Sequence, residues 1–268
     1  MIRLVAFDLD GTLIGPDLSL SSRVRRALDA ARACDVHVTV ATGRMFGATV
    51  AIARQLQLTT PLICYQGGWI QALTDPEPRY RASLPQEIAA EVLDLAAERR
   101  WHTVLYADGD FYLQQLRYPQ HFYALLLGED LKEVPAWEPV LAAHTPDKIL
   151  LVVDPEEIPA IAAQLRDCVA GRAEVVRSHE LFVEVVPQRV DKGAGLAWLA
   201  AHLGIPREEV LAVGDHENDL AMIQWAGVGV AMGNAVPVVQ AAADWIAPPL
   251  AADGAAVALE RFVLQEIG

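Results

Sequence analysis

The sequence predicts an α/β protein with a parallel-sheet core and a separate α+β unit inserted in the middle of the chain. Towards both ends, apolar runs of strand length alternate with segments of helical periodicity, which is typical of a parallel sheet. From about residue 85 the pattern changes to helices mixed with a hairpin. The 268 residues, 53% of them hydrophobic, suffice for two cores. We therefore expect a core formed by 1–84 and 188–268, interrupted by a unit at 85–187.

The first part of the core begins with an apolar run at 4–7, which predicts a buried strand. A helix follows, with Ser19 or Ser21 as its N-cap. Its apolar face would contain Leu20, Val24, Leu28 and Ala31. We expect a second strand at 36–41 and a third at 62–65, separated by another helix. That helix would bury Phe46, Val50, Ala53 and Leu56.

The middle third is predicted to contain two helices and several strands. The turn Asp108-Gly109-Asp110 would close a hairpin, and Asp154-Pro155-Glu156-Glu157 has the N-cap, proline and acid of a helix start. The expected elements are a helix at 86–100 and strands at 102–107, 148–153, 173–177 and 181–186. Alternation then resumes with a helix at 193–203, a strand at 210–213, a helix at 219–226 and a strand at 227–231.

Two carboxylates, Asp8 and Asp10, directly follow the first strand in the segment Asp8-Leu9-Asp10-Gly11-Thr12. Residues two apart on an extended chain point to the same side, so both acids would face the edge where ligands of α/β sheets bind. Two acids held together favour a divalent cation. A plain turn explains this segment equally well. A calcium loop does not, because Leu13 and Ser19 stand where glycine and glutamate are needed.

Three further segments carry polar residues at the ends of predicted strands or helices. The acids of 214–219 follow the strand at 210–213, although Asp215 or Asn218 could simply cap the next helix. Thr42-Gly43-Arg44 offers a hydroxyl and backbone amides suited to a phosphate oxygen. Lys192 begins a helix, where a cation opposes the helix dipole, so an anionic partner is expected unless this lysine lies on the surface.

Composition narrows the possible partners. The formal net charge of −14 makes nucleic acid and an anionic membrane surface unfavourable partners. A small anionic substrate is compatible, because exposed charges are screened over roughly 8 Å. Three separated cysteines, Cys34, Cys64 and Cys168, indicate buried reduced thiols and no disulfide framework. With no apolar stretch of membrane-spanning length, we expect a cytoplasmic protein.

Taken in order, these segments resemble the haloacid dehalogenase superfamily of phosphotransferases, and within it the Cof-type sugar-phosphatase-like branch. The resemblance covers essentially the whole chain. It rests on Asp8-Leu9-Asp10-Gly11-Thr12, Thr42-Gly43-Arg44, Asp191-Lys192-Gly193, 214–222, Ala231-Met232-Gly233-Asn234-Ala235 and Asp253-Gly254. It implies a Rossmann-like core with a large α/β cap at 85–187, with hinges near 83–85 and 187–188. One departure is Tyr65-Gln66-Gly67-Gly68, where relatives typically carry Asn-Gly.

The resemblance also implies roles for individual residues. Asp8 would attack the phosphorus of a small phosphomonoester, and Asp10 would act as the general acid and base. Mg²⁺ would be held by Asp8, the Asp10 carbonyl and Asp215, supported by Asp219. Phosphate or substrate contacts would come from Thr42, Gly43, Arg44, Lys192 and Asn218.

The implied activity is hydrolysis of phosphorylated sugars or cofactors. A hexose phosphomutase or a non-catalytic phospho-ligand-binding protein are the alternatives. Within the cap, His121 and His179 are conceivable substrate contacts.

Overall fold

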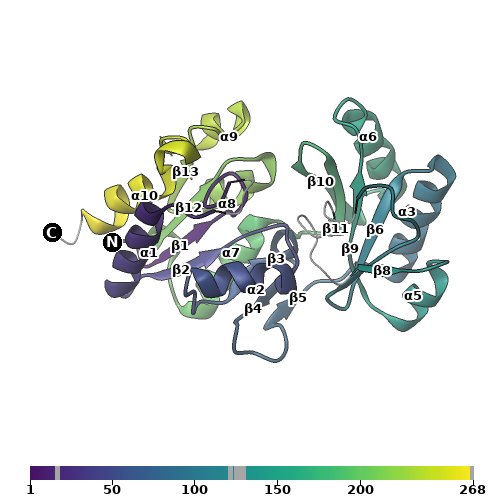
Figure 1. The fold of residues 1–268 in the computed structure, drawn as a ribbon, viewed down its shortest axis with the longest axis horizontal. Coiled ribbons are helices and arrows are strands. Elements are labelled where there is room, and N and C mark those ends of the chain that lie inside the picture. Colours follow the sequence, from purple (N-terminus) through teal and green to yellow (C-terminus); the bar gives the residue numbers. More distant parts are fainter. Residues whose placement is uncertain (16–18, 120–122, 124–130, 266–268) are drawn as a thin grey trace. The chain divides into compact units, whose positions relative to one another are not determined.

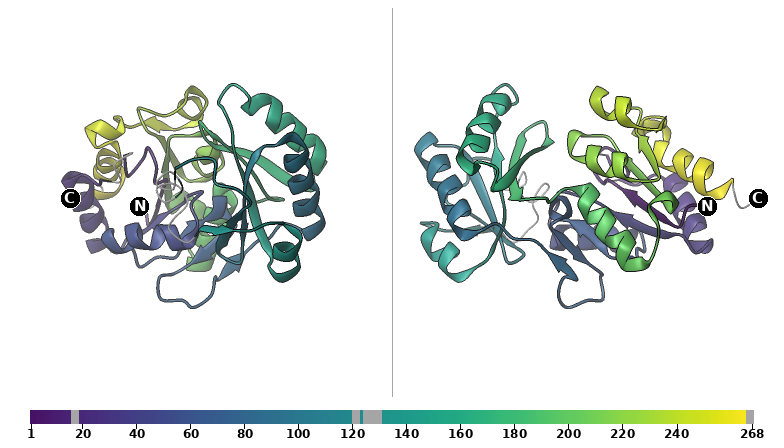
Figure 2. Two further views of the ribbon diagram at one scale, coloured as in Figure 1. Left: turned by 45° about the vertical axis from the view of Figure 1, so that its right-hand side comes forward. Right: turned by 180° about the vertical axis from the view of Figure 1, so that it is seen from behind.

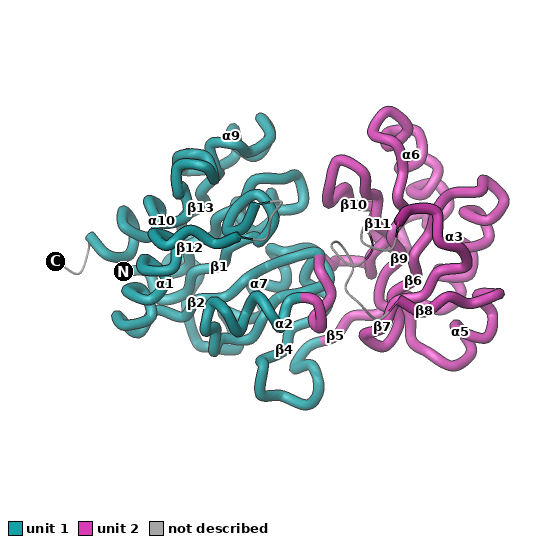
Figure 3. The backbone as a smooth tube through the Cα atoms, viewed as in Figure 1, with its two compact units in different colours: residues 1–43, 49–80, 191–268 teal, residues 44–48, 81–190 magenta. Residues whose placement is uncertain are grey.

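The chain folds into two compact units. The computed structural model describes residues 1–15, 19–119, 123 and 131–265. One unit contains 1–43, 49–80 and 191–268, and the other contains 44–48 and 81–190 (Figure 3). No helix in the described ranges has the length and apolar character needed to cross a membrane. The three cysteines are free thiols, and only Cys64 is fully buried.

The first unit contains a five-stranded parallel sheet. Its order is β14-β13-β12-β1-β2. The strands are β1 (Leu4–Phe7), β2 (His37–Val40), β12 (Val210–Gly214), β13 (Val228–Ala231) and β14 (Trp245–Ile246). The predicted α/β class with a parallel-sheet core is therefore confirmed. The strand order reverses between β1 and β12, and ligands of open α/β sheets bind at the carboxyl ends of such strands.

Helices cover both faces of this sheet. On one face α1 (Ser22–Ala33) packs against α10 (Gly254–Leu259), and on the other α7 (Lys192–Leu203) packs against α8 (Leu220–Trp225) (Figures 1 and 2). Of the two possible caps of α1, the structure has Ser21, whose side chain accepts a hydrogen bond from the Val24 backbone N–H. A short helix α9 (Pro237–Ala242) was not expected from the sequence.

The third predicted strand belongs to a different sheet. β3 (Leu62–Cys64) touches the main sheet through one bridge, between Ala41 and Ile63, and pairs instead with β4 (Trp69–Gln71). A third strand, β5 (Tyr80–Arg81), completes this small sheet. The strands β4 and β5 were not predicted from the sequence. Between β3 and β4 lies a single 3₁₀ turn, Tyr65–Gly67.

The helix α2 (Phe46–Gln55) confirms half of the predicted apolar face, because Ala53 and the following Leu56 are buried. Thr49 and Ala53 are its buried residues, whereas Phe46 and Val50 are only half-buried. Hydrophobicity therefore predicted the second half of the buried face but not Thr49, a polar residue that can be buried when its hydroxyl lies near another group. Here the Thr49 hydroxyl lies 3.8 Å from the Cys64 thiol.

The second unit is an α+β structure with a six-stranded sheet of order β10-β11-β9-β6-β7-β8. Its strands are β6 (His102–Ala107), β7 (Asp110–Leu113), β8 (Leu131–Glu133), β9 (Pro146–Val152), β10 (Ala173–His179) and β11 (Phe182–Pro187). The helices α3 (Gln86–Arg99) and α6 (Ile158–Val169) cover one face of the sheet in Figure 1. The predicted hairpin at 108–110 joins β6 and β7.

Two details of this unit differ from expectation. The segment 154–157 forms a turn, closed by a 3.0 Å hydrogen bond from the Glu157 N–H to the Asp154 carbonyl, and α6 begins only at Ile158. Because one turn can use the same N-cap and proline as a helix start, the sequence could not separate them. The short elements β8 and α5 (Glu138–Ala143) were not predicted.

A buried histidine in the second unit is expected to make stability depend on pH. The His102 Nε2 lies 2.8 Å from the Tyr123 hydroxyl, which accepts hydrogen bonds from the Arg117 and Tyr118 N–H groups. The hydroxyl proton therefore points to a neutral imidazole. Burial lowers the pKa of His102 to about 4.

We expect the unfolded state to bind more protons than the native state between pH 4 and 6.5, so His102 destabilises the second unit as the pH falls through that range. Relative to His102→Gln, the wild type should lose on the order of 2 kcal/mol between pH 7 and pH 4. Native-state hydrogen exchange of the β6 amides, recorded at both pH values, would measure this loss of stability. An equal pH dependence in both proteins would contradict the prediction.

Candidate active site

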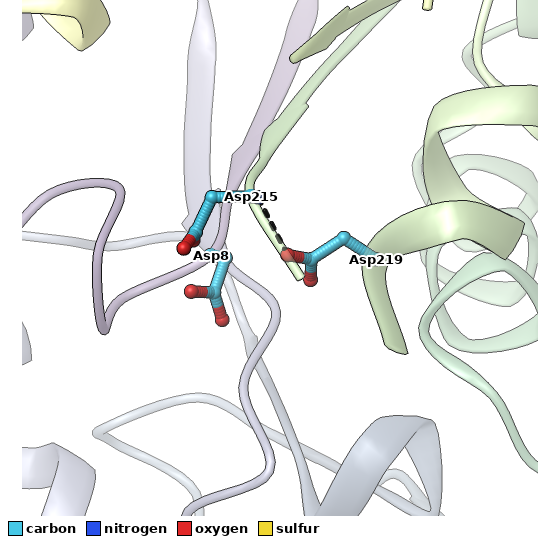
Figure 4. Close-up of side chains that lie close together, drawn as sticks. All are labelled: Asp8, Asp215 and Asp219. Carbon is cyan, nitrogen blue, oxygen red and sulfur yellow. Dashed lines mark hydrogen bonds between the residues drawn. The ribbon is translucent and has the colours of Figure 1, made fainter. Parts of the chain in front are cut away.

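The two predicted acidic segments meet at the carboxyl ends of neighbouring strands. Asp8 directly follows β1, and its N–H donates to the Val213 carbonyl of β12 at 2.9 Å. Asp215 directly follows β12. Asp8, Asp215 and Asp219 each place a carboxylate oxygen within 4.8 Å of the others (Figure 4). The reversal of strand order thus lies at a cluster of three carboxylates.

Lys192, at the start of α7, holds two of these carboxylates. Its Nζ lies 2.6 Å from an oxygen of Asp8 and 2.6 Å from an oxygen of Asp219. The lysine side chain is 1% exposed, which rules out the surface position that the sequence left open. The two carboxylates raise the pKa of the Lys192 ammonium, although burial alone would lower it. The anionic partner expected for a cation at a helix start is therefore this pair of acids.

The residue that caps the backbone N–H groups after β12 is Asp219. The sequence offered Asp215 or Asn218 for this capping role. Its second carboxylate oxygen accepts hydrogen bonds from the Asp215 and His216 N–H groups at 2.8 and 2.9 Å. Asp219 is fully buried, and its two carboxylate oxygens accept hydrogen bonds from the Lys192 ammonium and from these two N–H groups. Capping thus occupies Asp219 and leaves the Asp215 carboxylate available for another partner.

The crowding of acids changes their ionisation. Burial, opposed by Lys192 and reinforced by the neighbouring aspartates, raises the pKa of Asp8 well above its usual value. Burial and the Asp219 charge raise the pKa of Asp215 to about 7. A divalent cation would remove this repulsion, and carboxylate oxygens are the ligands that Mg²⁺ prefers. The residues at this site therefore fit a bound Mg²⁺.

The loop after Asp8 is fixed by contacts that sequence reasoning did not assign. Gly11 has a φ of +87°, and a Cβ there would lie 2.4 Å from an Asp215 oxygen, so only glycine fits. The Thr12 hydroxyl donates to the other Asp215 oxygen at 2.8 Å. Asn234 donates from Nδ2 to the Gly11 carbonyl at 2.9 Å. Both Thr12 and Asn234 lie in segments on which the family resemblance rests. That resemblance was the feature of the sequence that could have identified them as site residues. Asp10 is exposed on this loop.

Thr42 and Gly43 follow β2 and lie beside the turn Tyr65–Gly67. The Thr42 N–H donates to the Ile63 carbonyl at 2.8 Å, and the Thr42 carbonyl accepts from the Gln66 N–H at 3.1 Å. Gln66 Oε1 accepts from Asn218 Nδ2 at 3.0 Å. The structure therefore links Thr42 and Asn218 through Gln66, a residue that the sequence marked only as a departure from the family pattern.

The remaining predicted contacts belong to the second unit or lie outside the described residues. Arg44 begins the 44–48 segment of the second unit, and its role stays a prediction. His179 ends β10 and packs on the ring of Phe182, with ring centroids 4.9 Å apart. His121 lies outside the described residues.

Comparisons with protein-family models and with known proteins place the chain in one family. A family model described as haloacid dehalogenase-like hydrolase matches residues 5–259. The chain is 27% identical to 5-amino-6-(5-phospho-D-ribitylamino)uracil phosphatase from Bacillus subtilis, over 97% of this chain and 97% of that protein. It is 32% identical to an HMP-PP phosphatase from Klebsiella pneumoniae, over 90% of this chain and 88% of that protein.

Solved structures show the same fold over nearly the whole chain. A haloacid dehalogenase-like hydrolase from Bacteroides thetaiotaomicron is 32% identical and superposes with a TM-score of 0.84, covering 97% of this chain and 99% of that one. A Thermotoga maritima protein is 29% identical with a TM-score of 0.83, covering 98% of each chain.

Proposed function

Because this chain belongs to the haloacid dehalogenase-like hydrolase family and is a phosphatase, we propose that it is a Mg²⁺-dependent phosphomonoesterase acting through an aspartyl-phosphate. Its substrates are small phosphorylated metabolites, namely sugar phosphates or phosphorylated cofactors. The observation that carries this proposal is the buried Lys192, which bridges Asp8 and Asp219 at the carboxyl ends of β1 and β12. Relatives named as phosphatases of small phosphorylated compounds support the substrate class.

In the proposed reaction, an Asp8 carboxylate oxygen attacks the phosphorus, and the bond to the leaving oxygen breaks. Asp10 gives a proton to the leaving alcohol. It then takes a proton from a water molecule, which attacks the phosphorus of the phosphorylated Asp8 and releases inorganic phosphate. The exposure of Asp10 supports this role, because a residue that exchanges protons with substrate and water must be accessible.

The phosphate oxygens are held by the Thr42 hydroxyl, the Gly43 N–H and Lys192. An ammonium has three donors, and two of those on Lys192 are committed to carboxylates, so the third can meet a phosphoryl oxygen. Mg²⁺ would be held by the Asp8 carboxylate, the Asp10 carbonyl and Asp215, with Asp219 in support. When bound, the ion neutralises charge on the transferring phosphoryl group.

The test is phosphate release from a panel of sugar phosphates and phosphorylated cofactors, such as pyridoxal phosphate and flavin mononucleotide, with Mg²⁺ or with EDTA. We expect release only with Mg²⁺. Transfer of phosphate between sugar hydroxyls without net release would indicate a mutase instead. Metal-dependent binding of the panel without either reaction would indicate a non-catalytic binding protein.

The raised pKa values predict an unusual pH dependence of stability when metal is removed. The native state keeps a proton on Asp215 up to about pH 7, whereas the unfolded state loses it near pH 4, so native protein binds more protons between these values. The free energy of unfolding should therefore fall as the pH rises. The raised pKa of Asp8 changes the free energy of unfolding in the same direction.

We expect thermal unfolding in EDTA to occur about 3 °C higher at pH 6 than at pH 8. Mg²⁺ should remove this difference, because it binds the deprotonated carboxylates and so competes with protons. Asp215→Asn is the matched control, and it should flatten the dependence. A higher unfolding temperature at pH 8 than at pH 6 in EDTA would contradict the prediction.

A further inference from the structure

The turn between β3 and β4 holds three successive residues in the left-handed region. Tyr65, Gln66 and Gly67 have φ values of 52°, 59° and 103°. Tyrosine and glutamine rarely adopt this conformation, and it persists only where the surrounding structure enforces it. Gln66 is moreover 1% exposed, although a polar side chain of this length is usually on the surface. The turn is therefore built to place the Gln66 side chain inside the protein.

The surroundings of the turn belong to the candidate active site. The Gln66 N–H donates to the Thr42 carbonyl. Gly67 packs so closely on the segment before Lys192 that a Cβ would lie 2.2 Å from the Asp191 carbonyl oxygen. The turn is thus wedged between the proposed phosphate-binding residues and the start of α7.

The Gln66 carboxamide lies between Gly43 and Asn218. A Cβ at position 43 would lie 2.4 Å from Gln66 Nε2, so the amide occupies the space that the missing side chain leaves. On its other side, Gln66 Oε1 accepts the Asn218 Nδ2 hydrogen bond. Gln66 thereby fixes the orientation of the Asn218 carboxamide.

This orientation leaves one Asn218 atom available. Asn218 Oδ1 is buried and has no hydrogen-bond partner among the described residues. A buried acceptor without a donor is unfavourable, and such atoms are expected to meet a ligand or a water molecule. An acceptor oxygen does not suit a phosphate oxygen, but it suits a hydroxyl or amine donor.

We infer that Gln66 is a positioning residue, which holds Asn218 so that its Oδ1 accepts a hydrogen bond from a donor on the non-phosphate part of the substrate. This inference rests on the proposed phosphatase function and narrows its substrates to phosphomonoesters that carry such a donor. It also changes the predicted role of Asn218 from a phosphate contact to a contact with the alcohol portion. The strained turn is the device that brings the glutamine into place.

The test compares two substrates in the variant Gln66→Gly, which removes the side chain and suits the left-handed backbone. One substrate is the best of the panel, all of whose members carry hydroxyl donors. The other is p-nitrophenyl phosphate, which has no such donor outside its phosphate. We expect kcat/KM to fall about tenfold for the first substrate and to stay within about twofold for the second.

Two further variants complete the experiment. Asn218→Ala should reproduce the tenfold loss on the first substrate, and adding Gln66→Gly to it should have no further effect, because both changes remove one interaction. Gln57→Gly is the matched control, since Gln57 has a φ of 53° but is exposed in the turn that follows α2. It should leave both kcat/KM values unchanged.

The outcomes separate the two proposals. Wild-type protein that hydrolyses neither substrate would overturn the phosphatase function and this inference with it. Active wild type with equal losses on both substrates in Gln66→Gly would assign Gln66 a purely structural role. Additive losses in the double variant would show that Gln66 acts without Asn218, and either result would overturn the inference while the phosphatase function stands.

Discussion

Replacing Asp8 by asparagine is expected to reduce Mg²⁺-dependent phosphate release by at least about 1,000-fold. The amide has the size of the carboxyl group but cannot attack phosphorus to form an acyl phosphate. The loss should appear in kcat, because no other described acid replaces Asp8 at the end of β1 beside Lys192. Steady-state kinetics on the best substrate of the panel measures the effect.

The same variant should remain folded, which separates chemistry from stability. Burial, reinforced by the charges of Asp219 and Asp215, raises the pKa of Asp8, so a neutral group at this position removes a desolvated charge and relieves repulsion from these two acids. Lys192 keeps its contact with Asp219. We expect an unfolding temperature in EDTA at pH 8 no lower than that of wild type. Asp29→Asn, on the surface of α1, is the matched control and should keep full activity. Substantial phosphatase activity in Asp8→Asn would refute the aspartyl-phosphate mechanism.

Replacing Lys192 by methionine is expected to destabilise the first unit by about 3–5 kcal/mol and to abolish activity. The change leaves two buried carboxylates, Asp8 and Asp219, without their shared cation, and an uncompensated buried charge costs about this much. Because unpaired buried acids take up protons, the destabilisation should be smaller at pH 5.5 than at pH 8. Chemical denaturation at both pH values, in EDTA, measures it.

A lysine outside the first unit, Lys132, provides the control. Lys132 is half-exposed and pairs with Asp110 on the surface, so Lys132→Met should change stability by less than about 1 kcal/mol. The double variant Lys192→Met/Asp219→Asn should recover part of the lost stability, because it removes one unpaired charge, but it should not recover activity. A stable Lys192→Met protein at pH 8 would show that the buried cation is not needed to hold the acids.

The meeting of Asp8 and Asp215 could be predicted because parallel strands end at one edge of a sheet. The anionic partner of Lys192 was likewise foreseeable from the helix dipole. In both cases a local pattern, a strand or a helix start, determined where the side chain had to lie. The geometry of the β1 and β12 ends then brought these residues together.

Other parts of the site depend on contacts that no local pattern encodes. Gln66 reaches Asn218 only because the chain adopts a rare left-handed turn, and glutamine at that position gives no sign of it. Similarly, Asp219 and not Asp215 is the capping residue. Lys192 holds the Asp219 carboxylate and Thr12 holds the Asp215 carboxylate, and neither contact is encoded by a local pattern. Burial of Thr49 in place of Val50 shows the same limit for packing.

The insertion of the second unit has a consequence for how the chain is made. β1 and β2 leave the ribosome early, but the partner on the other side of β1 is β12, which begins only at Val210. The strands of the second unit all emerge in between, near one another in the chain. At about 5–20 residues per second, the apolar β1 waits on the order of ten seconds or more for its neighbour. The strands of the inserted unit are therefore available to pair during translation before the sheet that carries Asp8 has all its strands.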